Sequence, residues 1–107
     1  MGKFVIKQIK NGQYYFNLKA SNGQTIISSE GYTSKAGCLN GIHAVKLNST
    51  DDNKYKKLVS SNGKNFFNLK SSNGAIVGTS QMYSSKNSME LGIKAVKEIA
   101  RGAPIEN

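Results

Sequence analysis

The chain has a single cysteine, Cys38, among its 107 residues. One cysteine cannot form an internal disulfide, and without a second cysteine it provides no metal cluster. The sequence also has no apolar run long enough to cross a bilayer. We therefore expect a soluble, cytoplasmic protein with no membrane segment, no metal site and no cofactor.

Acidic residues are scarce, with six against 15 basic residues and a net charge of +9. The excess is spread along the chain, because residues 1–51 carry six lysines and two carboxylates and residues 52–107 carry nine basic and four acidic residues. Such a charge attracts phosphate-bearing or acidic partners in a salt-dependent way. Arg101 is the only arginine. Lysine lacks the planar guanidinium group that makes two hydrogen bonds to a guanine or a phosphate. The charge predicts electrostatic attraction of such partners without recognition of a particular sequence. The alternative is that the charge only keeps the protein soluble.

The main feature of the sequence is a repeat. Residues 11–46 align without a gap onto residues 62–97, at an offset of 51 residues, and 18 of these 36 positions are identical. A unit of about 50 residues buries a poor core alone, whereas two units fit one compact domain. We predict a single domain over residues 1–107, with repeat one at about 3–49, a linker at about 50–53 and repeat two at about 54–101.

Each repeat begins with three short segments rich in aromatic and branched residues, separated by turns that end in Asn-Gly. The predicted strands are 4–9, 13–20 and 24–29 in repeat one and 55–59, 64–71 and 75–80 in repeat two. A three-residue loop closed by a glycine bulge would place Leu18 opposite Ile26 and Leu69 opposite Val77. We adopt this register because it keeps an apolar pair in both repeats.

The register predicts nine residues on the core face of the sheet. They are Phe4, Ile6, Phe16, Leu18, Ile26, Tyr55, Phe67, Leu69 and Val77. Lys57 falls on the same face, which a lysine tolerates if its ammonium group reaches solvent at the sheet edge. The alternative is a shifted first strand in repeat two that brings Leu58 inward, and the register of that strand stays open.

The apolar period changes after the third strand of each repeat. Cys38, Ile42 and Val45 recur at helical spacing, as do Met89, Ile93 and Val96, which predicts helices at about 35–48 and 86–101. Ser34 and Ser85 stand at the N-cap positions. Gly41 and Gly92 indicate close packing against each helix. The fold class is therefore α+β, with two tandem β-β-β-α repeats that form a pseudo-twofold antiparallel sheet and two helices packed on one face.

Three strings recur in both repeats: FNLKxSNG, Tyr-x-Ser-Lys and Gly-Ile-x-Ala-Val-Lys. Together they resemble the YegP-like family of tandem β-β-β-α repeats of unknown function, over about Phe4 to Ala100. The resemblance implies a small bacterial or archaeal cytoplasmic protein, in a family whose single-unit members pair as dimers. It implies no established activity, cofactor or catalytic residue. Lys56 and Lys57 depart from the apolar residues that the family has in this strand.

Strand alternation predicts two ladders of an aromatic residue, an asparagine and a lysine on the sheet face away from the helices. They consist of Tyr15, Asn17 and Lys19 in repeat one and Phe66, Asn68 and Lys70 in repeat two. Such faces can stack bases and neutralise phosphates. The same face is expected to carry Val5, Ile9, Ile27, Leu58 and Ile76, which favours self-association or a protein partner. We predict a binding or self-association module that uses this face, with salt-sensitive binding of single-stranded nucleic acid or another polyanion as the alternative.

Comparison of the two repeats argues against an enzyme. Cys38 corresponds to Met89 on the apolar helical stripe, so we expect a small buried hydrophobe. His43 corresponds to Lys94 and is expected to be exposed, with no second histidine for a metal site. We therefore predict no catalytic residue.

Overall fold

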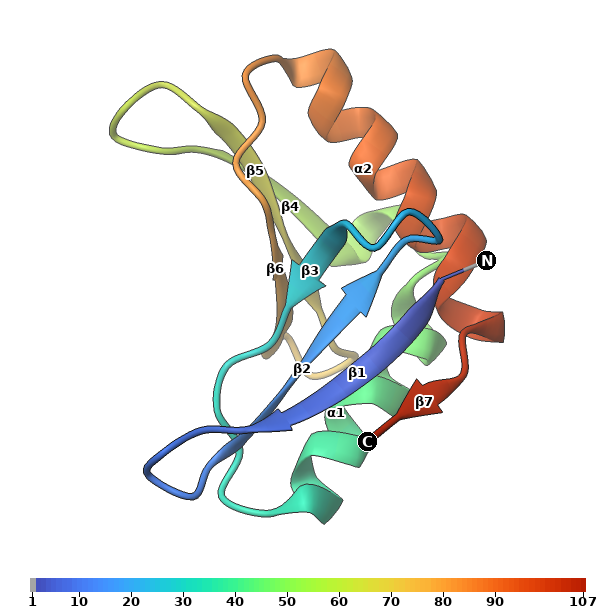
Figure 1. Cartoon of the computed structure of the whole chain (residues 1–107). Helices are drawn as coiled ribbons and strands as arrows, with labels where there is room; N and C mark the ends of the chain where they lie inside the picture. Colours follow the sequence, from blue (N-terminus) through green and yellow to red (C-terminus); the bar gives the residue numbers. More distant parts are fainter. Residues whose placement is uncertain (1) are drawn as a thin grey trace.

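Each repeat forms three strands followed by one helix, as predicted (Figure 1). The computed structural model describes residues 2–107. Repeat one contains β1 (Lys3–Gln8), β2 (Tyr14–Lys19), β3 (Thr25–Ser28) and α1 (Lys35–Asn48). Repeat two contains β4 (Tyr55–Val59), β5 (Asn65–Lys70), β6 (Ile76–Ser80) and α2 (Lys86–Ile99). Short 3-10 helices follow each α-helix, η1 (Asp52–Lys54) and η2 (Ala100–Gly102), and the chain ends with β7 (Ile105–Glu106).

The two repeats share one sheet, with strand order β4-β5-β6-β3-β2-β1-β7. They meet where β3 pairs antiparallel with β6 and Ser28 faces Thr79. These two residues occupy the same position in the two repeats, so the pseudo-twofold axis passes between them. The predicted fold class is confirmed, with one addition: β7 pairs parallel with β1, which makes the sheet mixed.

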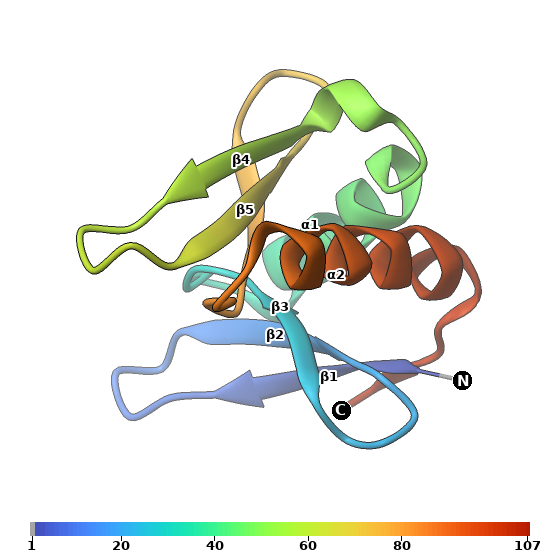
Figure 2. The same ribbon diagram turned by 90° about the horizontal axis from the view of Figure 1, so that it is seen from above.

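Both helices lie on the same side of the sheet. In Figures 1 and 2 they occupy the right of the view, while the turns of the β1-β2 and β4-β5 hairpins project to the left. Neither helix reaches the opposite side of the strands. We call this opposite side the outer face; it carries the strand residues that alternate with the core. None of the helices in residues 2–107 is long and apolar enough to cross a membrane.

The core lies between the sheet and the helices. All nine predicted inner residues of the strands are 8% exposed or less. The two predicted helical stripes complete the core, with Cys38, Ile42 and Val45 from α1 and Met89, Ile93 and Val96 from α2. Ser34 and Ser85 cap their helices, since each hydroxyl oxygen accepts a hydrogen bond from a backbone amide of the first turn at 3.0 Å.

The predicted pairing of β2 with β3 is wrong by one residue. The three-residue loop is present, because the Ala20 amide donates to the Gln24 carbonyl at 2.9 Å. A second irregularity then follows inside the strand, so that Leu18 pairs with Ile27 and not with Ile26. Both isoleucines consequently lie inside, and Ile27 is fully buried, contrary to its predicted place on the outer face.

Repeat two has the same irregularity, and there Leu69 pairs with Gly78 and not with Val77. The missing side chain at Gly78 makes room for Ile27, whose Cδ1 lies 3.0 Å from the position that a Cβ at residue 78 would occupy. The large residue of one repeat therefore fills the space left by the small residue of the other.

Lys57 faces the helices without any shift of register. It pairs with Phe67 across β4 and β5, and Leu58 points to the outer face. Because β4 is an edge strand, the Lys57 ammonium reaches solvent and lies 2.7 Å from a carboxylate oxygen of Glu90 on α2. Of the two alternatives, the structure therefore has the lysine on the core face with its ammonium group in solvent, and not the shifted strand.

The lysine that ends each repeated string ties its helix to the segment that follows the other helix. Lys46 donates a hydrogen bond to the carbonyl of Ala103 at 2.8 Å, and Lys97 pairs with Asp52, the residue equivalent to Ala103. Each ammonium also lies over an aromatic ring of the first strand, Lys46 at 5.6 Å from the centroid of Phe4 and Lys97 at 5.7 Å from that of Tyr55. The pseudo-symmetry thus extends to both post-helical segments.

Replacing Tyr55 with phenylalanine is expected to lower the free energy of unfolding by about 1–3 kcal/mol. The buried Tyr55 hydroxyl donates to the carbonyl of Ser49 at 2.6 Å, and the substitution leaves that acceptor without its donor. Urea unfolding measures the loss. Tyr15→Phe is the matched control and should change stability by less than about 0.5 kcal/mol, because Tyr15 is half-buried on the outer face.

The same substitution should change the response to alkaline pH. Burial, together with the nearby charge of Asp52, raises the pKa of Tyr55 well above its ordinary value. The folded state therefore favours the neutral phenol, and this contribution is fully present below about pH 10 and is lost as the pH rises further. Stability above that pH should fall less steeply in Tyr55→Phe than in the unmodified protein. Equal slopes for the two proteins would contradict this account.

Candidate functional site

The strand register builds one row of residues across the outer face. From one edge to the other the row reads Lys56, Asn68, Thr79, Ser28, Asn17, Val5 and Glu106. The predicted residues Asn17 and Asn68 therefore lie in the same row, on either side of the pseudo-twofold axis. Two hydroxyl residues separate them, one from each repeat.

The hydroxyl groups of this row hold the asparagine side chains. Ser28 Oγ donates to Asn17 Oδ1 at 2.6 Å, and Thr79 Oγ1 donates to Asn68 Oδ1 at 2.9 Å. Within residues 2–107 the amino group of neither asparagine makes a hydrogen bond. The row thus offers amide donors to a ligand rich in acceptors. Asn68 is only 9% exposed, so Asn17 presents more of this group than Asn68.

Five lysines share the outer face with the asparagines. They are Lys3, Lys7, Lys19, Lys56 and Lys70, each at a register position that alternates with the core. Among the described strands, Glu106 of β7 supplies the single carboxylate. It pairs with Lys3 at 2.8 Å, and this hydrogen bond, with the Lys3 charge, lowers the pKa of Glu106. The face consequently keeps an excess of positive charge.

The two predicted aromatic residues lie at opposite ends of the outer face. Because β2 and β5 run in opposite directions, Tyr15 lies at the same end as Lys70, and Phe66 at the same end as Lys19. Both rings are half-buried. The fold therefore brings all six predicted residues onto one face, but β3 and β6 separate the two ladders.

The outer face is less apolar than predicted. Ile27 belongs to the core, and Val5 and Leu58 are half-buried between longer neighbours. Ile9 and Ile76 remain exposed, at 42% and 44% of their surface. Two separated isoleucines are ordinary for a protein surface and form no large apolar patch.

The residues that chemistry would single out first are not assembled into a catalytic arrangement. Cys38 is fully buried, and burial raises the pKa of its thiol, which disfavours the nucleophilic thiolate. His43 is exposed on α1. Within residues 2–107 no three residues of the types His, Cys, Asp or Glu lie together as metal ligands would. Nothing in the arrangement of these described residues points to a particular enzymatic activity.

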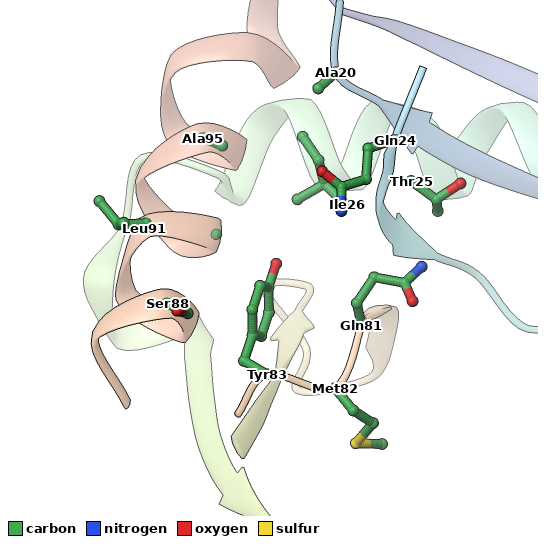
Figure 3. A pocket seen from close by; sticks show the side chains of 11 residues that line it. Ala20, Gln24, Thr25, Ile26, Gln81, Met82, Tyr83, Ser88, Leu91 and Ala95 are labelled. Atoms are coloured by element: carbon green, nitrogen blue, oxygen red, sulfur yellow. The ribbon is translucent and has the colours of Figure 1, made fainter. Parts of the chain in front are cut away.

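A pocket that sequence reasoning missed lies against α2, at the end of the sheet where Lys19 is found. It has a volume of about 370 Å³ and lies between the β2-β3 turn, the segment after β6 and one side of α2 (Figure 3). Tyr83 and Leu91 are among its lining residues. A difference between the repeats was the available signal, because Leu91 replaces Asn40 at an exposed helical position.

The arrangement defines a class of protein: a duplicated β-β-β-α unit that forms one sheet with helices on one face and a lysine-rich face opposite. The chain matches the family described as "Domain of unknown function (DUF1508)" twice, over residues 10–55 and 60–107. It belongs to this family, as the resemblance of its repeated strings predicted.

Relatives of similar length match nearly the whole chain in sequence. The chain is 48% identical to the "UPF0339 protein in ptx operon 5'region" of Stutzerimonas stutzeri, over 97% of this chain and 94% of the relative. It is 47% identical to the "UPF0339 protein YegP" of Escherichia coli (strain K12), over 90% and 87% of the two chains.

Two solution NMR structures have the same fold. The UPF0339 protein of Shewanella oneidensis superposes with a TM-score of 0.93 at 45% identity, over 98% of this chain and 89% of that chain. The YegP structure from E. coli, described as a protein of unknown function, also has a TM-score of 0.93, at 43% identity over 98% and 90% of the two chains. Family membership therefore establishes the fold and brings no activity with it.

Proposed function

We propose that this protein is a non-enzymatic binding module whose outer face binds single-stranded nucleic acid. One observation carries the proposal: an uncovered sheet face combines five lysines with two asparagine amino groups that make no hydrogen bond within residues 2–107. Phosphate and base edges are rich in acceptors, and both kinds of donor match them. Tyr15 and Phe66 supply ring surface on which bases can stack.

Self-association through the same face is supported less well. Pairing two outer faces would bring lysines of one copy against lysines of the other, and like charges at an interface oppose association. The burial of Ile27 also removes a central apolar residue on which such an interface would depend. The charge and donors of the face favour a partner of opposite charge over a second copy.

The binding is expected to tolerate many sequences. Lysine acts as a point charge and lacks the planar fork that recognises guanine in two places. Affinity should therefore depend on phosphate neutralisation and stacking, and it should fall steeply with salt. Because Lys3 pairs with Glu106, four lysines are available, and four neutralised phosphates predict a slope of log K against log salt of about −2.8 for a single strand.

Fluorescence anisotropy with a labelled single strand of about 16 nucleotides tests the proposal. Raising the salt fourfold from about 50 mM should weaken binding by up to about 50-fold. A duplex of the same length is the comparison, and it should bind more weakly because its bases cannot stack on the rings. Absence of an anisotropy change at micromolar protein in low salt would contradict the proposal. Self-association in sedimentation, without strand binding, would favour a second copy as the partner.

A further inference from the structure

The pocket between the β2-β3 turn and α2 is large enough for a small ligand. Its volume of about 370 Å³ falls within the range of ligand sites, about 300–1,000 Å³. The repeat supplies an internal comparison, because every lining residue has an equivalent 51 positions away. Residues that differ between the two places are not dictated by the shared fold.

Two exposed apolar residues occur at the pocket and not at the equivalent place. Met82 and Leu91 contribute to the lining and are 51% and 65% exposed. Their equivalents in repeat one are Gly31 and Asn40. The fold therefore does not require apolar side chains at these positions, and their exposure suits contact with a ligand.

The polar groups of the pocket differ from the equivalent place in the same way. Gln24 and Gln81 bring two amide side chains to the pocket, where the equivalents are Ala75 and Glu30. None of the lining residues is charged. The pocket therefore suits an uncharged ligand with hydrogen-bonding edges. At the equivalent place in repeat one, Glu30 would add a negative charge that repels an anionic ligand.

Tyr83 provides a further hydrogen-bonding group. Figure 3 shows its hydroxyl pointing into the space between Ile26 and α2. This hydroxyl makes no hydrogen bond within residues 2–107. Gly92 gives it room, because a Cβ at residue 92 would lie 2.3 Å from the Tyr83 hydroxyl oxygen.

The pocket lies at the end of the sheet where Lys19 is found. Thr25 lines the pocket and pairs directly with Lys19 across β2 and β3. Phe66 lies at the same end of the face as Lys19. A strand whose phosphates follow the lysines at this end would pass the mouth of the pocket.

We propose that this pocket accepts one neutral base of a single strand that lies on the outer face. The apolar rim would contact the ring of the base, while the glutamine amides and the Tyr83 hydroxyl would bind its edge. The inference rests on the proposed function, and it adds a base-binding site between the two repeats whose apolar and amide residues are not repeated at the pseudo-symmetric place.

Ala95→Leu tests the inference, because Ala95 lines the pocket from α2, on the side of the sheet opposite the outer face. Ala44→Leu is the matched control at the equivalent position of α1. The probes are labelled oligothymidylate and an abasic strand of equal length. Ala95→Leu should weaken binding of oligothymidylate about fivefold or more and leave the abasic strand within about twofold. Ala44→Leu should change neither. Equal effects of Ala95→Leu and Ala44→Leu on oligothymidylate would overturn the inference.

Methyl NMR of the unmodified protein keeps the test decisive if Ala95→Leu does not fold. Oligothymidylate should shift the methyl signals of Met82 and Leu91 together with the amide signals of Lys19 and Lys70. Shifts of the lysine amides alone would overturn the pocket and leave the proposed function standing. Methyl shifts with free thymidine, in a protein that binds no strand, would support the pocket and refute strand binding. No shift with either probe would overturn both.

Discussion

Replacing Gly41 and Gly92 together with alanine is expected to lower the free energy of unfolding by about 2 kcal/mol or more. A Cβ at Gly41 would lie 2.3 Å from the Tyr32 hydroxyl oxygen and 2.7 Å from its ring carbon Cζ, and a Cβ at Gly92 would lie 2.3 Å from the Tyr83 hydroxyl oxygen. Overpacking costs about 1–3 kcal/mol at each site. The better helix propensity of alanine, about 1 kcal/mol per site, offsets only part of this.

Urea unfolding measures the loss, and a second pair of substitutions identifies its cause. Adding Tyr32→Phe and Tyr83→Phe removes the two oxygens and should restore part of the stability. Recovery should stay incomplete, because the ring carbons remain close. In the protein that keeps both glycines, Tyr32→Phe and Tyr83→Phe should not raise stability. Comparing their effects with and without the glycine substitutions therefore isolates the steric contact.

Gly37→Ala is the control within the same helix. Its Cβ would lie 3.3 Å from Ser34 Oγ, and the equivalent residue in repeat two is Ser88, so this position accepts a side chain. We expect no loss and a gain of up to about 1 kcal/mol. A double variant as stable as the unmodified protein, or a Gly37→Ala variant that loses as much, would contradict the role assigned to the tyrosine and glycine pairs.

These pairs explain why the strings Tyr-x-Ser-Lys and Gly-Ile-x-Ala-Val-Lys recur together in both repeats. Tyr32 bridges to Tyr14 through two backbone hydrogen bonds, and Tyr83 bridges to Asn65 in the same way. Each tyrosine then places its hydroxyl against the glycine of its helix. The turn into each helix is thereby fixed to both the sheet and the helix.

The sequence predicted the elements and most of the core because the repeat tests each choice twice. Phe16 and Phe67 are identical in type and position, and both proved to be fully buried. The helical stripes were predictable for a similar reason, since Cys38 and Met89 share a period while their identities differ. The residue pattern within each strand and helix, present in both repeats, was sufficient to predict these elements and most of the core.

The second irregularity in β3 was not predictable from either hairpin alone. It depends on the pairing of β3 with β6, a contact between repeats that allows Ile27 to pack over Gly78. Strand β7 has only two residues, and its attachment through the Phe4 amide and the Pro104 carbonyl, at 2.8 Å, is equally remote in sequence. Contacts between strands so far apart in the sequence leave little periodic pattern within either strand from which they could be predicted.

The candidate site was predictable in position but not in detail. Alternation placed Asn17 and Asn68 on the outer face, yet the hydroxyl groups that hold them come from β3 and β6 after the corrected register. The pocket was missed because its walls come from both repeats, although the replacement of Asn40 by Leu91 was a visible signal.

Removing three outer-face lysines is expected to weaken binding of a single strand by about tenfold or more. The variant carries Lys19→Gln, Lys56→Gln and Lys70→Gln. An ion pair at the protein surface contributes about 0.5 kcal/mol, so three of them together correspond to about tenfold in affinity. Glutamine keeps a polar side chain of similar reach, so the strands should remain intact. The slope of log K against log salt should become shallower by about 2, or about 0.7 for each phosphate that is no longer neutralised.

The matched control removes the same charge from the helical side of the molecule. It carries Lys35→Gln, Lys86→Gln and Lys94→Gln, three exposed residues of α1 and α2. Both variants have a net charge of +6, since three of the nine excess charges are removed in each. Any difference between them therefore reports the location of the charge and not its amount.

The salt dependence of strand binding in these two variants tests the central claim most directly, namely that the outer face is the binding surface. The account predicts a large loss of affinity and a shallower salt slope for the outer-face variant, with the helix-face variant close to the unmodified protein. Equal losses in both variants would show that net charge alone attracts the strand, and would contradict a binding site on the outer face.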